Sequence, residues 1–366
     1  MNKTKKKIII ASGGTGGHIF PAYGLAKHFI GKNVDVKISS DARGLKYLKD
    51  FPNLNVIKIP SSTIYNKNIF RLSISLTIIF YSVIKSILFL FQYKPNLIFG
   101  MGGYSSFPVC LAAKLVGIPF VIYENNLHIG KANKYLSPYA KKVLVSYKEV
   151  EGIPSQYKKK VYEIGNIIRK EIIDFSQKKQ NYSRDKKLSI LILGGSQAAK
   201  IFAEKLPKIL EQCHKAGVPL KIYQQCLPEQ NNYLTNLYNN INLECEIFNF
   251  SNDIINYFSK ANLAITRAGS SMLAELINVN IPFISVPLPS SADNHQLKNA
   301  IYYEKNQYSY LIEEKDLDKK LLGLIKEINK DRSLLSFITA KQSQYSDNSV
   351  YDIIDEEINK LLNEKH

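Results

Sequence analysis

Short apolar runs alternate with stretches of helical periodicity along almost the whole chain, and this alternation constrains the fold most. In the first half the apolar runs are residues 7–11, 34–39, 55–59, 97–100, 120–123, 142–145 and 161–164. After a lysine-rich polar stretch at 176–187, a second series comprises residues 188–193, 220–224, 245–248, 263–266 and 283–286. Strands that alternate with helices form parallel sheets with crossover helices. The pattern therefore predicts an α/β protein of two doubly wound, Rossmann-like domains, with ligands at the carboxyl ends of the strands.

We place the domain boundary near Gly165. This gives an N-terminal domain of residues 1–165 and a C-terminal domain of residues 166–344. Apolar residues recur at helical spacing between 350 and 362, so the tail is expected to form an amphipathic helix that packs on another element.

Charge is distributed unevenly between the two halves. The 366-residue chain carries 49 Lys and Arg against 31 Asp and Glu, a net charge of +18. Residues 1–165 hold 24 basic and 7 acidic side chains (+17), and the remainder holds 25 and 24 (+1). This asymmetry favours an anionic partner for the first half, either a nucleic acid or a membrane surface. A general lysine bias would affect both halves, and only six arginines argue against nucleic acid, since arginine is the residue most used to read bases.

The segment 69–91 is strongly apolar, but Arg71 and Lys85 leave only residues 72–84 uninterrupted between them. A membrane-spanning helix needs about 20 apolar residues. The segment is either a core helix or a basic-flanked helix lying in the bilayer interface, and a span is the least favoured reading. The four cysteines are scattered and form no CxxC pair, which indicates thiols of a reducing compartment. We expect a soluble or peripheral cytoplasmic protein.

Two glycine-rich loops follow strands in the first half. One reads from Ser12 to His18 as SGGTGGH before a helix expected near Pro21, and the other begins at Gly100 as GMGGYSS. Glycines let backbone N–H groups approach an anion or a sugar closely, although two ordinary turns would look similar. Neither the dinucleotide-binding pattern GxGxxG nor the Walker pattern fits the first loop. His18 is a candidate general base. Glu124, at the end of a neighbouring strand, is the second candidate for this role.

The second half contains three comparable motifs. The sequence GGSQ at 194–197 follows a strand and resembles a phosphate cradle, and RAGSS at 267–271 precedes a helix that carries Glu275. A carboxylate one turn inside such a helix is well placed to bind a ribose diol, and Arg169 could pair with a diphosphate. The motif DNHQ, which ends at Gln296, precedes another helix. Asp316 and Asp318 lie at a charge-dense helix start, where acidic residues are favoured anyway, so we predict no metal site.

Together these motifs resemble the MurG family of peptidoglycan glycosyltransferases. GGTGGH, GMGGYSSFP, the 124–126 patch, the 165–169 stretch, GGSQ, RAGSSMLAE and DNHQ occur in that family's order over nearly the whole chain. The resemblance implies the GT-B architecture, in which two Rossmann-like domains face a central cleft and a C-terminal helix, here 345–366, packs back on the first domain. It also implies transfer of N-acetylglucosamine from UDP-N-acetylglucosamine to undecaprenyl-diphosphate-muramyl-pentapeptide, which converts lipid I to lipid II.

The same resemblance implies roles for individual residues. UDP-N-acetylglucosamine would be contacted by Thr15, Gly16, Gly17, Asn126, Arg169, Ser196, Ser251, Ser270, Ser271, Met272, Glu275 and Gln296. The acceptor-side loop would comprise Gly102, Gly103, Tyr104 and Ser105. The sequence departs from the family pattern at Asn125, where Gln is usual, at Ile167 and Ala198, where Pro and Gly are usual, and at Ser251, where an apolar residue is usual. The expected chemistry is an inverting single displacement without metal or cofactor.

Two other functions fit part of the pattern. A UDP-N-acetylglucosamine 2-epimerase shares the architecture but needs no lipid acceptor. A non-catalytic membrane-docking subunit that binds a nucleotide sugar would keep the basic half and show no turnover. Under the favoured function, the protein is expected at the cytoplasmic face of the bacterial inner (plasma) membrane, bound peripherally to the anionic leaflet. Cell-wall synthesis proteins are then candidate partners.

Overall fold

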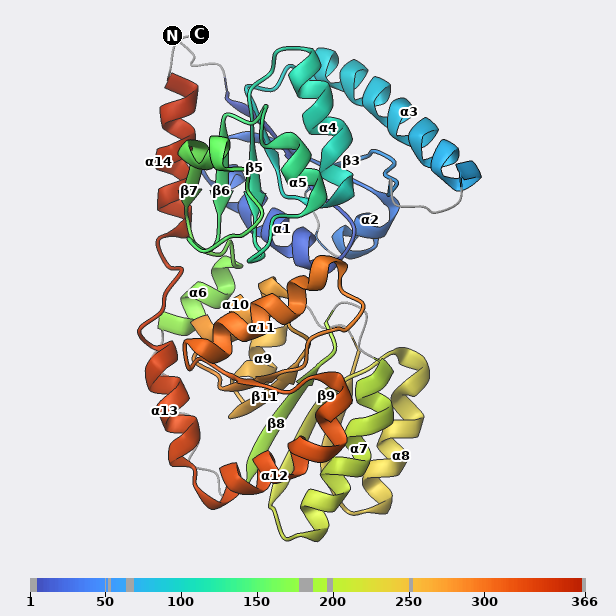
Figure 1. Ribbon diagram of the computed structural model, residues 1–366, viewed down its shortest axis with the longest axis vertical. Coiled ribbons are helices and arrows are strands. Elements are labelled where there is room, and N and C mark those ends of the chain that lie inside the picture. The colour runs from blue at the N-terminus through green and yellow to red at the C-terminus, as the bar shows by residue number, and fades with distance from the viewer. Residues whose placement is uncertain are drawn as a thin grey trace. The chain divides into compact units, whose positions relative to one another are not determined.

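The computed structural model describes residues 5–49, 51, 54–63, 69–177, 187–195, 200–249 and 253–363. The chain divides into two compact units (Figure 1): unit 1 is Met1–Arg169 with Asp347–His366, and unit 2 is Lys170–Ser346. Each unit contains one parallel sheet with helices around it. The predicted fold class, two doubly wound α/β domains, is confirmed.

The sheet of unit 1 has the strand order β3-β2-β1-β4-β5-β6-β7. Its strands are β1 (Lys7–Ala11), β2 (Asp35–Ser40), β3 (Asn55–Lys58), β4 (Leu97–Gly100), β5 (Phe120–Glu124), β6 (Lys142–Val145) and β7 (Val161–Glu163). The direction of winding reverses between β1 and β4, where Ala11 pairs with Gly100. The two glycine loops follow these two strands, so they meet at the switch point where ligands of open α/β sheets bind.

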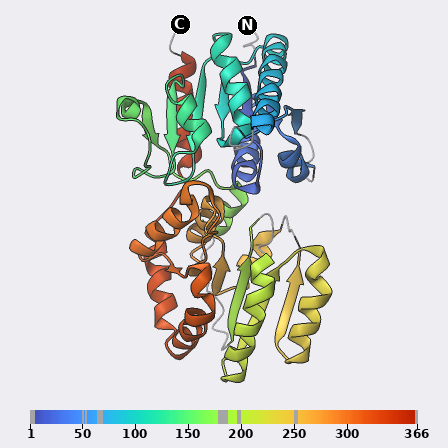
Figure 2. The same cartoon turned by 45° about the vertical axis from the view of Figure 1, so that its right-hand side comes forward.

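Helices cover both faces of this sheet. They are α1 (Gly16–Gly31), α2 (Ala42–Leu48), α3 (Ile69–Tyr93), α4 (Gly103–Leu115) and α5 (Lys131–Leu136), with the 3-10 turn η1 (Ser155–Lys160) and the C-terminal α14 (Val350–Asn363). In Figures 1 and 2, α3 lies alongside α4, and the two helices pack together.

The helix α14 belongs to unit 1 although it is the last element of the chain. A buried ion pair joins Glu357 of this helix to Lys142 of β6. Asp355 pairs with His28 of α1, at 3.0 Å. These contacts place an acidic helix against a basic unit.

The sheet of unit 2 repeats the same winding with the order β10-β9-β8-β11-β12-β13. Its strands are β8 (Leu188–Leu193), β9 (Leu220–Gln225), β10 (Glu244–Phe248), β11 (Leu263–Thr266), β12 (Phe283–Ser285) and β13 (Tyr310–Leu311). Its helices are α6 (Lys170–Gln177), α7 (Lys200–Lys215), α8 (Asn231–Asn240), α9 (Ile254–Phe258), α10 (Ser270–Asn278), α11 (His295–Lys305), α12 (Leu317–Lys330) and α13 (Ser333–Gln342), with 3-10 turns η2 (Pro228–Gln230), η3 (Ala292–Asn294) and η4 (Glu314–Asp316). The two-residue strand β13 was not expected from its sequence.

The boundary between the units lies four residues beyond the expected one. After Gly165, which has a φ of +83°, the backbone N–H of Asn166 donates to Asp347, at 2.8 Å. The N–H of Ile167 donates to the Tyr123 hydroxyl, at 2.9 Å. These hydrogen bonds hold the segment on unit 1, so Arg169 belongs to unit 1 and not to the C-terminal domain.

The helix α3 buries one face and exposes an apolar one. Its buried face includes Ser75, Ser82, Val83, Ser86, Leu90 and Tyr93. Its exposed large apolar side chains are Ile69, Phe70, Ile74, Leu76, Phe80, Tyr81, Ile84, Leu88 and Phe91. Within the described residues, α3 is the one helix long and apolar enough to cross a membrane by length and composition, with a mean hydropathy of 2.1 and 33% of that window buried. A core helix would hide these side chains, so the core-helix alternative does not describe α3.

Candidate functional site

The first glycine loop is shorter than expected, because α1 begins at Gly16 and not near Pro21. His18 therefore lies in the first turn of a helix. Pro21 has no N–H with which to bond the carbonyl four residues earlier, that of Gly17. The side-chain amide of Asn125, at the end of β5, donates to this Gly17 carbonyl at 3.0 Å. The proline is tolerated inside the helix because another strand supplies the missing donor.

His18 joins the two glycine loops. Ser12 donates from its hydroxyl to the His18 carbonyl at 2.9 Å, which ties the first turn of α1 to the end of β1. Gly102 and Gly103 have φ values of +83° and +72°, and a Cβ on either would lie 3.3 to 3.4 Å from the imidazole ring. The ring thus lies over the second loop, and glycine is needed there for both backbone conformation and space.

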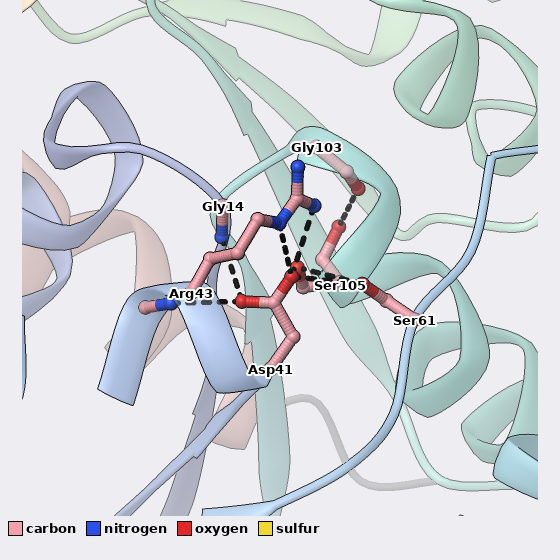
Figure 3. Close-up of polar contacts among 8 residues, drawn as sticks. Gly14, Asp41, Arg43, Ser61, Gly103 and Ser105 are labelled. Carbon is pink, nitrogen blue, oxygen red and sulfur yellow. Dashed lines mark hydrogen bonds and ion pairs between the residues drawn. The ribbon is translucent and has the colours of Figure 1, made fainter. Parts of the chain in front are cut away.

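A buried carboxylate that the motif analysis missed supports the same loops. Asp41, the N-cap of α2, accepts hydrogen bonds from the backbone N–H groups of Gly14 and Gly44, each at 2.9 Å. It also accepts from the Ser61 hydroxyl at 2.9 Å and from Arg43 at 2.9 and 3.1 Å (Figure 3). An aspartate between a strand and a helix is a typical N-cap, and this signal could have found it.

The charge of Asp41 is strongly stabilised. Burial raises the pKa of this carboxyl, but the hydrogen bonds from Gly14, Gly44, Ser61 and Arg43 outweigh burial and lower the pKa to about 2. The carboxylate orients the Arg43 guanidinium, whose side chain is 59% exposed and lies beside Gly14 (Figure 3). The site thus has a fixed cation next to its first glycine loop.

Glu124 has a similar structural role. One carboxylate oxygen accepts from the backbone and side-chain N–H groups of Asn126, both at 3.1 Å. The other accepts from the Gly130 N–H at 2.8 Å and from the Asn133 amide at 3.0 Å. The residue is only 2% exposed. A carboxylate that already accepts four hydrogen bonds is poorly placed to take a substrate proton, so the geometry favours His18 over Glu124 as the base.

The remaining predicted residues of unit 1 lie around the same sheet edge. Thr15 is exposed at the N-terminus of α1 and makes no side-chain cap. Ser105 is buried and donates to Ser61 at 3.4 Å, next to the Asp41 cluster. The Arg169 guanidinium lies 5.4 Å from the centre of the Phe20 ring on α1.

In unit 2 the predicted motifs again follow the two strands at the switch point. Gly194 and Gly195 follow β8, and Gly195 has a φ of +77°. The neighbouring β11 leads to Gly269, after which α10 begins with Ser270, Ser271 and Met272. Glu275 is buried on the same helix, 4% exposed. Ser196 and Ser251 lie outside the described residues.

The loops of unit 2 are held by an arginine. Arg267 is 8% exposed and donates to the carbonyls of Val286 and Pro287, both at 3.3 Å. It also pairs with Glu314 at 2.5 Å. The arginine of the RAGSS motif therefore fixes the loop after β12, a role that the motif alone did not reveal.

The motif before α11 has an unusual backbone. Asp293 and Asn294 both have left-handed φ values, +51° and +54°. The side-chain oxygen of Gln296 accepts from the Leu288 N–H at 3.0 Å, which closes this loop. Such conformations in non-glycine residues cluster at ligand sites.

The acidic pair at 316 and 318 is bound to lysines. Asp316 pairs with Lys320 at 3.1 Å, and Asp318 pairs with Lys205 at 2.7 Å. Among the described residues, no group of three His, Cys, Asp or Glu side chains could hold a metal ion.

Comparison with known proteins identifies the family. Residues 8–145 match the glycosyltransferase family 28 N-terminal domain, and residues 189–356 match its C-terminal domain. A protein of Pelagibacter ubique (strain HTCC1062), the UDP-N-acetylglucosamine--N-acetylmuramyl-(pentapeptide) pyrophosphoryl-undecaprenol N-acetylglucosamine transferase, is 34% identical over 98% of this chain and 99% of its own length. The chain belongs to the MurG family of glycosyltransferases.

Solved structures agree with this assignment. The crystal structure of Acinetobacter baumannii MurG has a TM-score of 0.75 at 26% identity and covers 96% of this chain and 99% of its own. A UDP-N-acetylglucosamine 2-epimerase has a TM-score of 0.64 at 12% identity, covering 97% and 96%, which shows a shared fold alone. The expected GT-B fold class and glycosyltransferase activity are confirmed, and the epimerase alternative is not favoured.

Proposed function

We propose that this enzyme transfers N-acetylglucosamine from UDP-N-acetylglucosamine to the undecaprenyl-diphosphate-linked muramyl-pentapeptide, lipid I, and so makes lipid II for peptidoglycan. The observation that carries the proposal is the pair of switch points. Each unit places two of the family's motifs side by side there, while the relatives act on these substrates by name. Unit 1 would hold the acceptor, and unit 2 would hold the UDP-sugar.

The proposed chemistry is an inverting single displacement that uses no metal. The acceptor hydroxyl attacks the anomeric carbon while UDP leaves, with His18 accepting the hydroxyl proton. In unit 2, the N-terminus of α10 would stabilise the negative charge that develops on the leaving diphosphate. Glu275 would accept hydrogen bonds from the ribose diol. Because Asp41 and Glu124 fix the loops around His18, little reorganisation is needed when the acceptor binds.

The proposed location is the cytoplasmic face of the bacterial plasma membrane. The exposed apolar face of α3 opposes its packed face, and unit 1 carries most of the net positive charge. A helix of this kind lies in the interface with its apolar side among the acyl chains, while basic residues meet anionic headgroups.

One assay tests the function. The protein is incubated with UDP-N-acetylglucosamine labelled in the sugar and a lipid I analogue, with and without EDTA, and the lipid fraction is analysed. Label in the lipid, joined through a β-linkage in both conditions, is expected. Conversion of UDP-N-acetylglucosamine to UDP-N-acetylmannosamine, with no label in the lipid, would indicate the epimerase. Absence of turnover would indicate the binding subunit, and loss of activity in EDTA would contradict the metal-free mechanism.

A further inference from the structure

Unit 1 contains a pocket that none of the predicted sugar-nucleotide contacts explains. It is open to solvent and lies where α3, α4 and α5 meet. Its walls are mostly apolar and come from Ile79 of α3, Tyr104 and Phe107 of α4, and Ala132 and Tyr135 of α5. Lys131 contributes the one charged side chain of the lining.

The position of the pocket links two surfaces that are already described. Ile79 belongs to α3, whose neighbouring residue Phe80 is one of the exposed apolar side chains of that helix. Tyr104 belongs to the acceptor-side loop, directly after Gly103, over which the His18 ring lies. The pocket therefore lies between the apolar helix and the first turn of α4, which directly follows the second glycine loop.

One lining residue of the pocket is next in sequence to a residue of the Asp41 cluster. Ser62 lines the pocket and donates to Ser75 of α3 at 2.9 Å, while its neighbour Ser61 donates to Asp41. Asp41 in turn orients Arg43. Lys131 lines the pocket, and Arg43 lies beside Gly14 of the first glycine loop, so each of these two places has a cation.

We propose that this pocket binds the first isoprene units of a polyprenyl-diphosphate-linked acceptor, with the diphosphate held between Lys131 and Arg43. The proposal rests on the proposed function. An acceptor sugar that reaches the glycine loop must draw the adjacent part of its hydrocarbon chain away from the bilayer. Exposing that chain to water is unfavourable, and an apolar pocket beside the loop removes this cost. Branched, unsaturated five-carbon units suit a pocket walled by aromatic rings better than a charged or sugar ligand does.

The test uses water-soluble acceptors, so that membrane binding does not contribute. One analogue carries two isoprene units on the diphosphate, a second carries an unbranched decyl chain, and a third carries a methyl group. Wild-type enzyme is expected to use them in that order of kcat/KM. Both ten-carbon chains bury apolar surface that the methyl group lacks, at about four-fold in affinity for each buried methylene. The branched, unsaturated chain should rank above decyl because it packs better against the aromatic rings.

Tyr135→Ala removes one wall of the pocket, and Tyr139→Ala is its matched control. Both side chains are exposed tyrosines, at 66% and 47%, but only Tyr135 lines the pocket. Tyr135→Ala is expected to lower kcat/KM for the isoprenyl acceptor about ten-fold and for the methyl acceptor less than two-fold, with the KM for UDP-N-acetylglucosamine unchanged. Tyr139→Ala should leave all three acceptors within two-fold of wild type.

A second variant fills the pocket. Ala132→Phe should abolish the preference for isoprenyl over methyl acceptor, and thermal unfolding of the variant shows whether it is folded. Equal loss on all three acceptors, or no loss in Tyr135→Ala, would overturn the proposed pocket while transfer itself continues. If wild-type enzyme transfers sugar to none of the acceptors, the proposed function fails instead.

Discussion

Units 1 and 2 share one winding order but differ in surface. In both, the sheet reverses direction between the first strand and the fourth in its chain order, and glycine loops follow these two strands. Unit 1 holds 27 basic and 13 acidic residues (+14), and unit 2 holds 22 and 18 (+4). The helix α3 alone exposes nine large apolar side chains, whereas the described part of unit 2 exposes four: Tyr233, Leu288, Ile301 and Phe337. The shared strand order decides where a ligand binds in each unit. The charge and apolar exposure of the surface decide what else that unit can bind.

Loops at the carboxyl ends of the strands are also fixed by opposite charges in the two units. In unit 1 the carboxylates of Asp41 and Glu124 accept hydrogen bonds from backbone N–H groups. In unit 2 the guanidinium of Arg267 donates to backbone carbonyls. A carboxylate accepts hydrogen bonds and so holds a loop whose backbone N–H groups point toward it. A guanidinium donates hydrogen bonds and so holds a loop whose carbonyl groups point toward it.

The largest expected effect tests whether the chemistry belongs to unit 1. His18→Ala should lower kcat by about 100-fold or more, because general-base catalysis contributes at least that much. His214→Ala, on α7 of unit 2, is the control and should turn over within two-fold of wild type. Steady-state kinetics with a soluble acceptor decides the question, and near-normal turnover of His18→Ala would remove the residue from the role of base.

The next largest effect tests whether the membrane-binding surface belongs to unit 1 alone. Replacing Leu88 and Phe91 of α3 by Glu should weaken binding to anionic vesicles by roughly 50-fold, since two apolar side chains no longer enter the interface. Phe337→Glu, at an exposed aromatic of unit 2, should not change vesicle binding. Co-sedimentation across a salt series measures both, and equal effects of the two changes would contradict a membrane face confined to unit 1.

A smaller effect tests whether unit 2 binds the sugar donor, UDP-N-acetylglucosamine. Glu275→Gln should raise the KM for UDP-N-acetylglucosamine by about ten-fold, because hydrogen bonds to a charged acceptor are worth about 1.5–3 kcal/mol. The KM for the acceptor should stay constant. Glu304→Gln, on the neighbouring α11, serves as control. A rise in the KM for the acceptor alone would show that Glu275 binds the acceptor and not UDP-N-acetylglucosamine.

The smallest effect concerns the support of the loops in unit 1. Asp41→Asn should lower kcat/KM for the acceptor by roughly five-fold through a less ordered glycine loop, and it should also lower the free energy of unfolding. Because the pKa of Asp41 is lowered in the folded state, its stabilising contribution is complete above about pH 4 and is lost as the pH falls toward 2. Urea unfolding should therefore show that the difference in free energy of unfolding between wild type and Asp41→Asn becomes smaller from pH 4 to pH 2. A constant difference over this range would contradict the stabilising role of the Asp41 carboxylate.

Most of the fold was predictable because the strands are buried on both faces and so read as continuous apolar runs. The strands Lys7–Ala11, Leu97–Gly100 and Leu188–Leu193 have the predicted bounds. The short β13 lacks such a run. The start of α1 was misplaced because proline usually marks the first turn of a helix, and only the distant Asn125 makes Pro21 acceptable inside one.

The sequence by itself determined the two α/β domains, the glycine loops and the charge asymmetry, since these depend on local pattern and composition. Only the tertiary structure decided which loops meet, that Asp41 and Arg267 hold them, and that the apolar face of α3 points away from its packed one. Such facts depend on strand order and on partners many residues apart. A hydrogen bond between Asp41 and Gly14 leaves no periodic trace in the chain, because its two residues meet only when the sheet brings their strands together.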